Sequence, residues 1–321
     1  MSAEIIDEEE ATKARVKERQ RATALSVRAS TWPPVTPASH GQQQPPLRRN
    51  IAVGDLHGDL VNTKAVLKMA GLVDDRGRWT GGRDRLIQLG DVADRGPDTL
   101  ALFRYLYQLR KEAAAAGGEV VLIMGNHELM TLMHKKHRLR LPFMRDPFSE
   151  HGEIGRWLKH LPIMQVIDGT VYAHGGVSPY WAKLGCERTN LQAQKSIKRY
   201  IHSGDLLAAK MQFPVFGDNG PAWYRRYAYD KDEAAVSELL DEALGALGAR
   251  RMVVAHSPTR SPKMHVRCQG KFIDIDTKIS RFFKWPDGTP DGNHLSALEI
   301  IGDRVTAIYP DGRELISCGA D

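Results

Sequence analysis

Six short segments of this chain place metal-binding side chains directly after an apolar run. They are, in chain order, Gly54-Asp55-Leu56-His57-Gly58, Gly90-Asp91-Val92-Ala93-Asp94-Arg95-Gly96, Gly125-Asn126-His127-Glu128, His174-Gly175-Gly176, His256-Ser257-Pro258 and the weaker Asp274-Ile275-Asp276. The preceding residues favour β-structure, as in Ile51-Ala52-Val53 and Val253-Val254-Ala255. Short apolar runs that stop before polar residues predict buried strands that present ligands at their carboxyl ends. One site is therefore expected to gather residues from most of the chain.

The residue types in these segments indicate the kind of metal. Carboxylate and amide oxygens and imidazole nitrogens suit divalent cations such as manganese, iron or zinc, whereas a soft site would need thiolates. The candidate ligands are Asp55, His57, Asp91, Asn126, His174 and His256. They are more than one closed tetrahedral site needs. Two metal ions that share a carboxylate would use all of them.

The series of motifs resembles the calcineurin-like metallophosphoesterases, and within them the phosphoprotein phosphatases. Gly54-Asp55-Leu56-His57-Gly58-Asp59-Leu60, Gly220-Pro221-Ala222-Trp223-Tyr224-Arg225 and Ile273-Asp274-Ile275-Asp276 are most similar to the Shewanella-like protein phosphatase branch. The resemblance covers about residues 50–310. It implies two packed mixed β-sheets flanked by helices, an α/β fold of β-sandwich type, with the metal site along one edge.

The resemblance also distributes the ligands between two metal ions. It implies Asp55, His57 and Asp91 for the first ion, and Asp91, Asn126, His174 and His256 for the second. Asp91 would then bridge the pair. Such a pair lowers the pKa of a water molecule between the ions and stabilises both ends of an in-line displacement.

Other residues of the motifs are expected to act on the substrate. His127 carries no metal in this assignment and is interpreted as the general acid, with Asp94 fixing its tautomer. Arg95, Arg225 and Asn126 are expected to contact the phosphoryl oxygens, since a planar guanidinium suits bidentate phosphate contact. Arg226 is the alternative to its neighbour Arg225. Glu128 is interpreted as a structural anchor.

Apolar periodicity predicts strands that alternate with helices in the first half and closely spaced strands later. The expected elements are strands at 51–54, 85–90 and 119–124, helices at 58–71 and 97–115 with Pro97 in the first turn, a helical and capping stretch at 128–165, and strands at 170–174, 251–255, 271–275, 296–301 and 304–309. Turns at Asn293, Gly302-Asp303 and Asp311-Gly312 suggest hairpins between the later strands.

Residues 1–48 are expected to be a disordered tail that precedes a catalytic domain at 49–321. The tail is rich in Pro, Gln and Ser, a composition that buries too little apolar surface to offset chain ordering, although a short helix at 7–27 is compatible with it. Its Arg and Ser content leaves organellar targeting open, but the acidic run 7–10 favours a cytoplasmic protein. Three widely spaced cysteines are interpreted as reduced thiols.

Net charge and hydropathy limit the classes of partner that the chain is expected to bind. The net charge of +6 is spread through a sequence that also holds 39 acidic residues, with one local cluster at 134–140, so nucleic acid is not the expected partner. No apolar run is long enough to span a membrane. The sequence does not determine the oligomeric state.

These observations lead to a two-metal phosphatase, with manganese as the expected cation, that hydrolyses phosphoproteins or phosphopeptides by direct attack of water. The residues do not distinguish phosphoserine or phosphothreonine from phosphotyrosine. One alternative is a dinucleoside polyphosphate hydrolase with related motifs. Another is an inactive binding scaffold, whose hallmark would be lost ligands, yet all six ligands are present.

Overall fold

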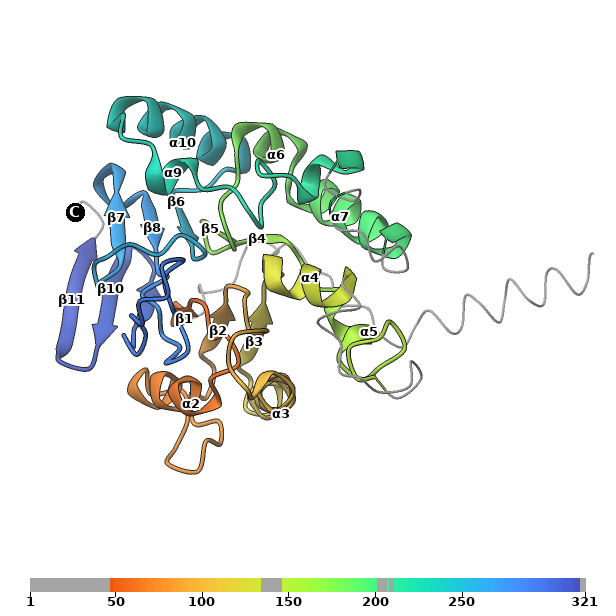
Figure 1. Cartoon of the computed structure of the whole chain (residues 1–321). Helices are drawn as coiled ribbons and strands as arrows, with labels where there is room; N and C mark the ends of the chain where they lie inside the picture. The colour runs from red at the N-terminus through yellow and green to blue at the C-terminus, as the bar shows by residue number, and fades with distance from the viewer. Residues whose placement is uncertain (1–46, 134–145, 201–206, 208–210, 318–321) are drawn as a thin grey trace, which may run out of the picture. The chain divides into compact units, whose positions relative to one another are not determined.

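The computed structural model of the chain describes residues 47–133, 146–200, 207 and 211–317. In this part of the chain, two β-sheets pack face to face and helices lie on their outer sides (Figure 1).

The strands are β1 (Asn50–Val53), β2 (Arg85–Gln88), β3 (Glu119–Leu122), β4 (Met164–Ile167), β5 (Thr170–Ala173), β6 (Arg251–Val254), β7 (His265–Arg267), β8 (Phe272–Asp274), β9 (Ala297–Ile301), β10 (Arg304–Tyr309) and β11 (Gly312–Ser317). The helices are α2 (Leu60–Met69), α3 (Thr99–Ala115), α4 (Asn126–Met133), α5 (Gly155–Leu158), α6 (Pro179–Leu184), α7 (Cys186–Tyr200), α9 (Arg226–Tyr229) and α10 (Glu233–Leu247), with 3-10 turns η4 (Pro214–Phe216) and η5 (Cys268–Gly270).

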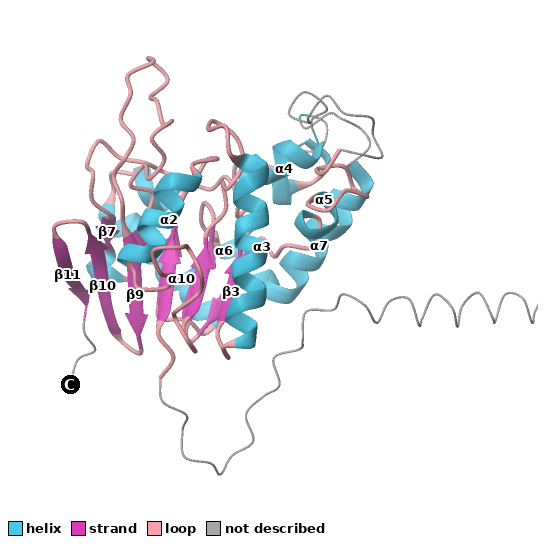
Figure 2. Ribbon diagram, turned by 90° about the horizontal axis from the view of Figure 1, so that it is seen from below, coloured by secondary structure: helices cyan, strands magenta, loops and turns pink. Residues whose placement is uncertain are grey.

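The first sheet has six strands in the order β11-β10-β9-β1-β2-β3. Strands β1, β2 and β3 run parallel, and β9, β10 and β11 are joined to them and to one another by antiparallel pairing (Figure 2). The hairpins predicted at Gly302-Asp303 and Asp311-Gly312 are confirmed, since these turns connect β9 to β10 and β10 to β11. Helices α2 and α3 lie on the outer side of the parallel half of this sheet (Figure 1).

The second sheet has five strands in the order β4-β5-β6-β8-β7. Its centre is again parallel, because β5 pairs with β6 and β6 with β8 in the same direction. Helices α6, α7 and α10 lie on its outer side (Figure 1). Both sheets are mixed, and the predicted fold class is confirmed.

Alternation along the central strands explains how both of their faces are buried. In β1, Ala52 packs into the apolar layer between the sheets, whereas Ile51 and Val53 pack on the side of the helices. The layer between the sheets combines Ile87 of the first sheet with Val253 of the second. Short runs with apolar residues at every position therefore form buried strands, as the sequence predicted.

The structure corrects three predicted elements. Helix α3 begins at Thr99, after Pro97, because the carbonyl of Asp98 already accepts the first helical N–H, that of Leu102. The stretch 128–165 is helical only in part: in its described residues α4 ends at Met133, α5 is one turn, and Pro147 and Pro162 lack the N–H that a longer helix would need. Asn293 does not form a hairpin turn, and its side chain instead accepts a hydrogen bond from Asn62.

Some predictions fall on residues that the structure does not describe. They are the tail up to residue 46, with its helix at 7–27, and the basic cluster at 134–140. Of the predicted tail, Leu47 and Arg48 are described, and the Arg48 guanidinium donates to the Glu119 carboxylate and the Gly117 carbonyl. Cys186 and Cys268 are free thiols. No described helix has both the length and the apolar character that crossing a membrane requires.

Candidate active site and metal centre

The parallel strands bring the predicted site residues to one edge of the two sheets. Asp55, Asp91 and Asn126 follow β1, β2 and β3, whose carboxyl ends meet because the strands are parallel and adjacent. His174 and His256 follow β5 and β6 of the second sheet in the same way. A cleft of about 410 Å³ opens between these ends. Its lining includes the predicted residues Asp55, His57, Asp91, Arg95, Asn126, His127, Arg225 and His256.

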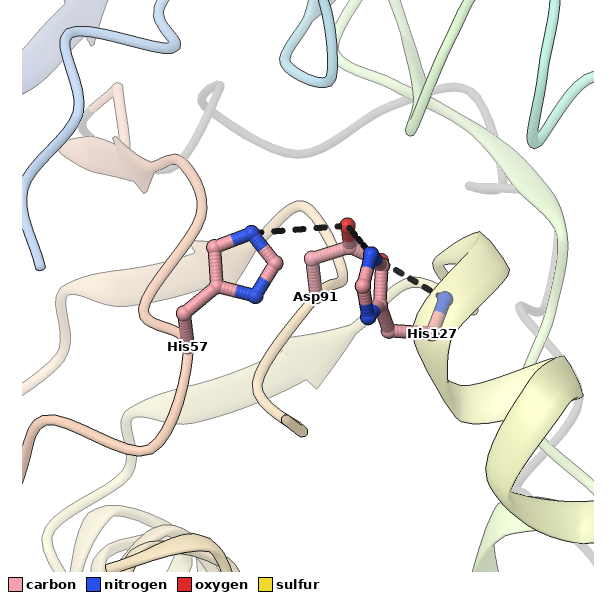
Figure 3. Close-up of side chains that lie close together, drawn as sticks. All are labelled: His57, Asp91 and His127. Atoms are coloured by element: carbon pink, nitrogen blue, oxygen red, sulfur yellow. Dashed lines mark hydrogen bonds and ion pairs between the residues drawn. The ribbon is translucent and has the colours of Figure 1, made fainter. Parts of the chain in front are cut away.

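Asp91 lies at the centre of this arrangement. Its Oδ2 is 3.8 Å from His57 Nε2 and 3.7 Å from His127 Nε2 (Figure 3), and its Oδ1 is 3.2 Å from His174 Nε2. Two sets of ligand atoms, each lying within 4.8 Å of one another, are possible metal sites: His57 with Asp91 and His127, and Asp91 with His174 and His256. Asp91 belongs to both sets, as expected of a carboxylate that bridges two ions.

Backbone carbonyls orient two of the imidazoles. Nδ1 of His57 lies 3.0 Å from the carbonyl of Ala93, and Nδ1 of His174 lies 2.7 Å from the carbonyl of Leu89. A carbonyl can only accept, so in both rings Nδ1 carries a hydrogen and Nε2 is the atom that faces the site. Nε2 of His174 lies 2.9 Å from the amide oxygen of Asn126, which places these two predicted ligands of the second ion together.

The charges of the site favour bound cations. Burial and the neighbouring Asp91 raise the pKa of Asp55 to about 6. Burial lowers the pKa of His174, but the charges of Asp91 and Asp55 outweigh it and raise that pKa to about 10. Burial and the charge of His174 hold the pKa of His256 well below its usual range. The buried carboxylates of Asp55 and Asp91 thus lie beside the neutral imidazole of His256, a combination that favours the binding of cations.

His256 gives a direct indication that this edge fits a metal. Its Nε2 atom is buried and has no hydrogen-bond partner, although the residue lines the cleft. An unsatisfied buried nitrogen is costly, and a neutral imidazole is a common ligand of divalent cations. The oxygen and nitrogen donors of the site, with an orphaned imidazole and a shared carboxylate, therefore fit two divalent cations.

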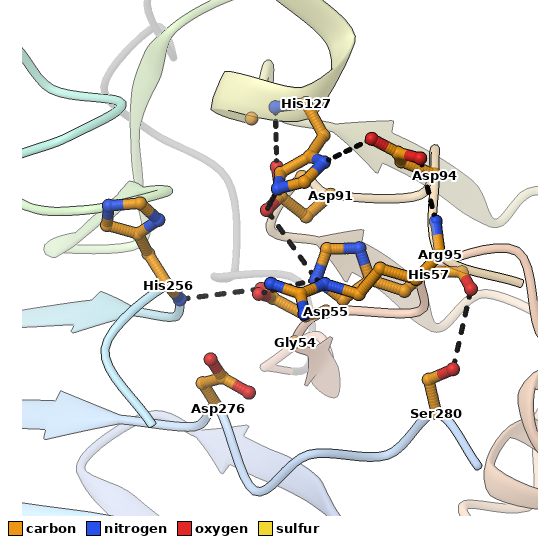
Figure 4. Close-up of polar contacts among 12 residues, drawn as sticks. Gly54, Asp55, His57, Asp91, Asp94, Arg95, His127, His256, Asp276 and Ser280 are labelled. Carbon is orange, nitrogen blue, oxygen red and sulfur yellow. Dashed lines mark hydrogen bonds and ion pairs between the residues drawn. The ribbon is translucent and has the colours of Figure 1, made fainter. Parts of the chain in front are cut away.

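His127 and Asp94, the residues predicted as the general acid and its partner, lie next to each other. His127 is in the first turn of helix α4, its backbone N–H donates to Asp91 Oδ1 over 2.9 Å, and its Nδ1 lies 3.1 Å from Asp94 Oδ2 (Figure 4). Burial lowers the pKa of His127, but Asp91 and Asp94 more than compensate, so the pKa is raised. Nε2 can then carry a proton toward the cleft. The same atom lies within reach of the first metal set, so distance alone does not separate the acid from a ligand.

Two predicted arginines line the cleft. Arg95 Nε donates to His57 Nε2 over 3.0 Å. Arg225 Nη1 donates to the carbonyl of His256 over 2.5 Å. Arg226 pairs with Asp230 instead and does not line the cleft. The geometry thus favours Arg225 over its neighbour.

Glu128 fixes the loop that carries Asp91. Its carboxylate accepts hydrogen bonds from the backbone N–H groups of Asp91, Ala93 and Gly125 at 2.8–2.9 Å. A Cβ on Gly125 would lie 2.3 Å from both the backbone nitrogen and the Oδ1 of Asp91, so a side chain there would displace the central carboxylate. Glu128 is therefore the anchor that was predicted.

Backbone strain is concentrated in the same loops. His57, Asp91, Asp94, Arg95 and His256 all have positive φ, between 42° and 73°, a region that non-glycine residues rarely occupy. Strained residues of this kind persist where the surrounding structure over-determines them, commonly at functional sites.

Several cleft residues were not predicted as site residues. They are Tyr229, Pro258, Asp276, Phe283, Lys284, Trp285 and Pro286. Asp276 belonged to the weakest segment of the sequence pattern. Most of the others lie in the long connection between β8 and β9, where no spacing rule identifies a wall of a cleft.

Comparisons with known proteins agree with this geometry. Residues 49–259 match the calcineurin-like phosphoesterase family model. Shewanella-like protein phosphatase 2 of Arabidopsis thaliana is 27% identical, with 76% of this chain and 74% of that protein covered. A symmetrical bis(5'-nucleosyl)-tetraphosphatase of Nitrosomonas europaea is 30% identical, with 77% and 84% covered. A crystal structure of a cold-active protein-tyrosine phosphatase from a Shewanella species is 26% identical, with a TM-score of 0.69, and 84% of this chain and 81% of that chain are covered.

Proposed function

Because this chain belongs to the calcineurin-like phosphoesterase family and resembles its Shewanella-like protein phosphatase branch, we propose that it hydrolyses phosphomonoesters of phosphoproteins. The observation that carries the proposal is the position of Asp91. It belongs to both candidate metal sets and also holds the backbone of His127, the expected acid. Metal centre and proton donor are therefore built around one carboxylate.

The residues of the chain have separate tasks in this reaction. Arg95 and Arg225 orient the phosphoryl group, together with the Asn126 amide. A water oxygen attacks phosphorus and releases a proton to solvent, the bond from phosphorus to the ester oxygen breaks, and the leaving oxygen takes a proton from His127 Nε2. Divalent cations would be held by Asp55, His57, Asp91, Asn126, His174 and His256, and would supply positive charge for the phosphoryl oxygens and acidify the attacking water. We propose manganese as the cation, on the oxygen and imidazole donor set.

Hydrolysis of a dinucleoside polyphosphate is the second candidate, because a tetraphosphatase is among the similar proteins. A polyphosphate chain carries charge well beyond the reacting phosphorus and needs further cationic side chains. The cationic side chains that line the described cleft are Arg95, Arg225 and the exposed Lys284. Two guanidinium groups suit one phosphoryl group, which supports a monoester.

The test compares substrates at equal enzyme and manganese concentrations. Phosphoserine, phosphothreonine and phosphotyrosine peptides are measured beside diadenosine tetraphosphate, and a chelated sample is the control. We expect at least one peptide to have the highest kcat/KM and chelation to abolish its hydrolysis. A higher kcat/KM for diadenosine tetraphosphate than for every peptide would replace the proposal with the polyphosphatase. Full activity after exhaustive chelation would exclude the two-metal mechanism.

A further inference from the structure

Asp276 lies beside the metal centre without a role in the mechanism given above. Strands β6 and β8 are parallel and in register, with Val254 opposite Asp274. His256 follows Val254 by two positions and Asp276 follows Asp274 by two positions. The two residues therefore leave the sheet as neighbours. Asp276 is 6% exposed and lines the same cleft as His256.

A close backbone contact brings Asp276 to Asp55 of the other sheet. A Cβ on Gly54 would lie 2.8 Å from the carbonyl oxygen of Ile275, so the segments that precede Asp55 and Asp276 touch directly. Figure 4 shows the Asp276 carboxylate directed into the space between Asp55 and His256. Burial, and then the charge of Asp55, raise the pKa of Asp276 to about 8. Both carboxyl groups are buried, and a cation between them would offset the cost of burying their charges.

The two cationic side chains that follow Asp276 most closely in the chain pair with other carboxylates. Its Oδ1 accepts the backbone N–H of Lys278 over 3.1 Å, but the Lys278 ammonium pairs with Asp291. Arg281 pairs with Asp59. Among the described residues, no Lys or Arg side chain forms an ion pair with Asp276.

A second, independent observation points to a ligand at this place. Nε2 of His256, the neighbour of Asp276, is buried without a hydrogen-bond partner. A buried carboxylate without a counter-ion and a buried imidazole nitrogen without a hydrogen-bond partner are both unfavourable alone. Cations of the two-metal centre would stabilise both.

We propose that Asp276 is a further cation-binding carboxylate of this centre and acts, through a water molecule, on the ion that Asp55 and His57 hold. Asp276, like Asp55, belongs to neither set of ligand atoms that lie within 4.8 Å of one another, and a water molecule between its carboxylate and the ion is part of the proposal. The inference rests on the metal centre of the proposed function. It adds to that centre a residue that follows β8, a strand after which no other ligand has been assigned.

The experiment measures metal binding rather than catalysis. Asp276→Asn removes the charge and keeps an oxygen for the Lys278 N–H. Manganese is titrated calorimetrically into chelator-stripped, desalted protein, and thermal midpoints are recorded in chelator and in manganese. We expect the Kd for manganese to rise about 10–100-fold, as for residues that support a metal from outside its direct ligands. In chelator, the midpoint should stay equal or rise, because a neutral amide replaces a buried carboxyl group that has no counter-ion, and manganese should raise it less than in wild type.

Asp291→Asn is the matched control from the same connection. Asp291 accepts hydrogen bonds from Lys278 Nζ and Trp285 Nε1, so its loss should lower the midpoint with and without manganese and leave the Kd near the wild-type value. An unchanged Kd in Asp276→Asn, or a Kd change accompanied by the lower chelator midpoint expected of Asp291→Asn, would overturn the inference. Wild-type protein that binds no manganese would instead count against the proposed metal centre itself.

Discussion

The edge of the first sheet and the edge of the second contribute to the site in different ways. Around Asp91, the polar groups are satisfied within the protein, because Glu128 binds three backbone N–H groups and the Asp91 carboxylate accepts the N–H of His127. On the second sheet, His256 Nε2 and Asp274 Oδ2 are buried and have no partner.

We call the first edge a frame, because hydrogen bonds within the protein hold its backbone, and we expect the second edge to require a bound cation. Hydrogen bonds within the protein fix the backbone of the first edge around Asp91, so this loop can keep its geometry before a cation binds. The second edge has unsatisfied donors and acceptors, so we expect its stability to depend on bound metal. Substitutions at the two edges should therefore fail in distinguishable ways.

Asp91→Asn tests the comparison most strongly, because Asp91 is assigned to both ions. We expect kcat to fall roughly 10³-fold or more with p-nitrophenyl phosphate as substrate, since the charge that joins the two ions is lost. Elemental analysis should show that metal content falls as well. His256→Ala is the comparison from the second edge and should retain more metal than Asp91→Asn. Equal metal loss in both variants would contradict the bridging role.

His127→Ala tests whether His127 acts as the general acid or as a metal ligand. We expect it to keep its metal content while kcat falls about 10²-fold or more, because a general acid typically contributes that much. The defect should shrink as the leaving group becomes more acidic, since a good leaving group needs less protonation. An alkyl phosphate and p-nitrophenyl phosphate provide the contrast. A loss of metal together with an equal defect on both substrates would make His127 a ligand.

The sequence predicted the first edge more completely than the second. Asp55, Asp91 and Asn126 stand in compact motifs, each directly after a buried strand, and parallel pairing places them together. Glu128 could be identified as an anchor because it adjoins such a motif. The distribution of ligands between the ions came from family resemblance, and the structure adds the shared position of Asp91.

What the sequence did not reveal depends on contacts between the sheets. Asp276 is placed beside Asp55 by the close contact between Gly54 and Ile275, two residues that are far apart in the chain. Trp285 and its neighbours line the cleft through a long connection without periodicity. Strands β4, β7 and β11 were not predicted; β11 is exposed along most of its length and therefore shows no apolar pattern.

Glu128→Gln tests whether the first edge is a frame. The substitution replaces one accepting oxygen by a donor, so at least one of the buried N–H groups of Asp91, Ala93 and Gly125 loses its partner. Such a loss costs about 1–3 kcal/mol. We expect a lower thermal midpoint in chelator and in manganese alike, and a roughly 10–100-fold loss of activity. A midpoint lowered only in the presence of manganese would assign Glu128 to the metal, and the frame would lose its main support.

Arg225→Lys should have the smallest effect of these substitutions. It tests how the second edge contributes to substrate binding. Arg225 is held by the His256 carbonyl, so its guanidinium is oriented before a phosphoryl group binds. A lysine keeps the charge but loses the planar pair of donors. Loss of one hydrogen bond worth about 1 kcal/mol corresponds to about a fivefold rise in KM for phosphopeptides, with kcat changed less. Arg226→Lys is the matched control, because Arg226 pairs with Asp230 outside the cleft and should leave KM unchanged. If Arg226→Lys raises KM and Arg225→Lys does not, the arginine that binds phosphate has been assigned to the wrong position.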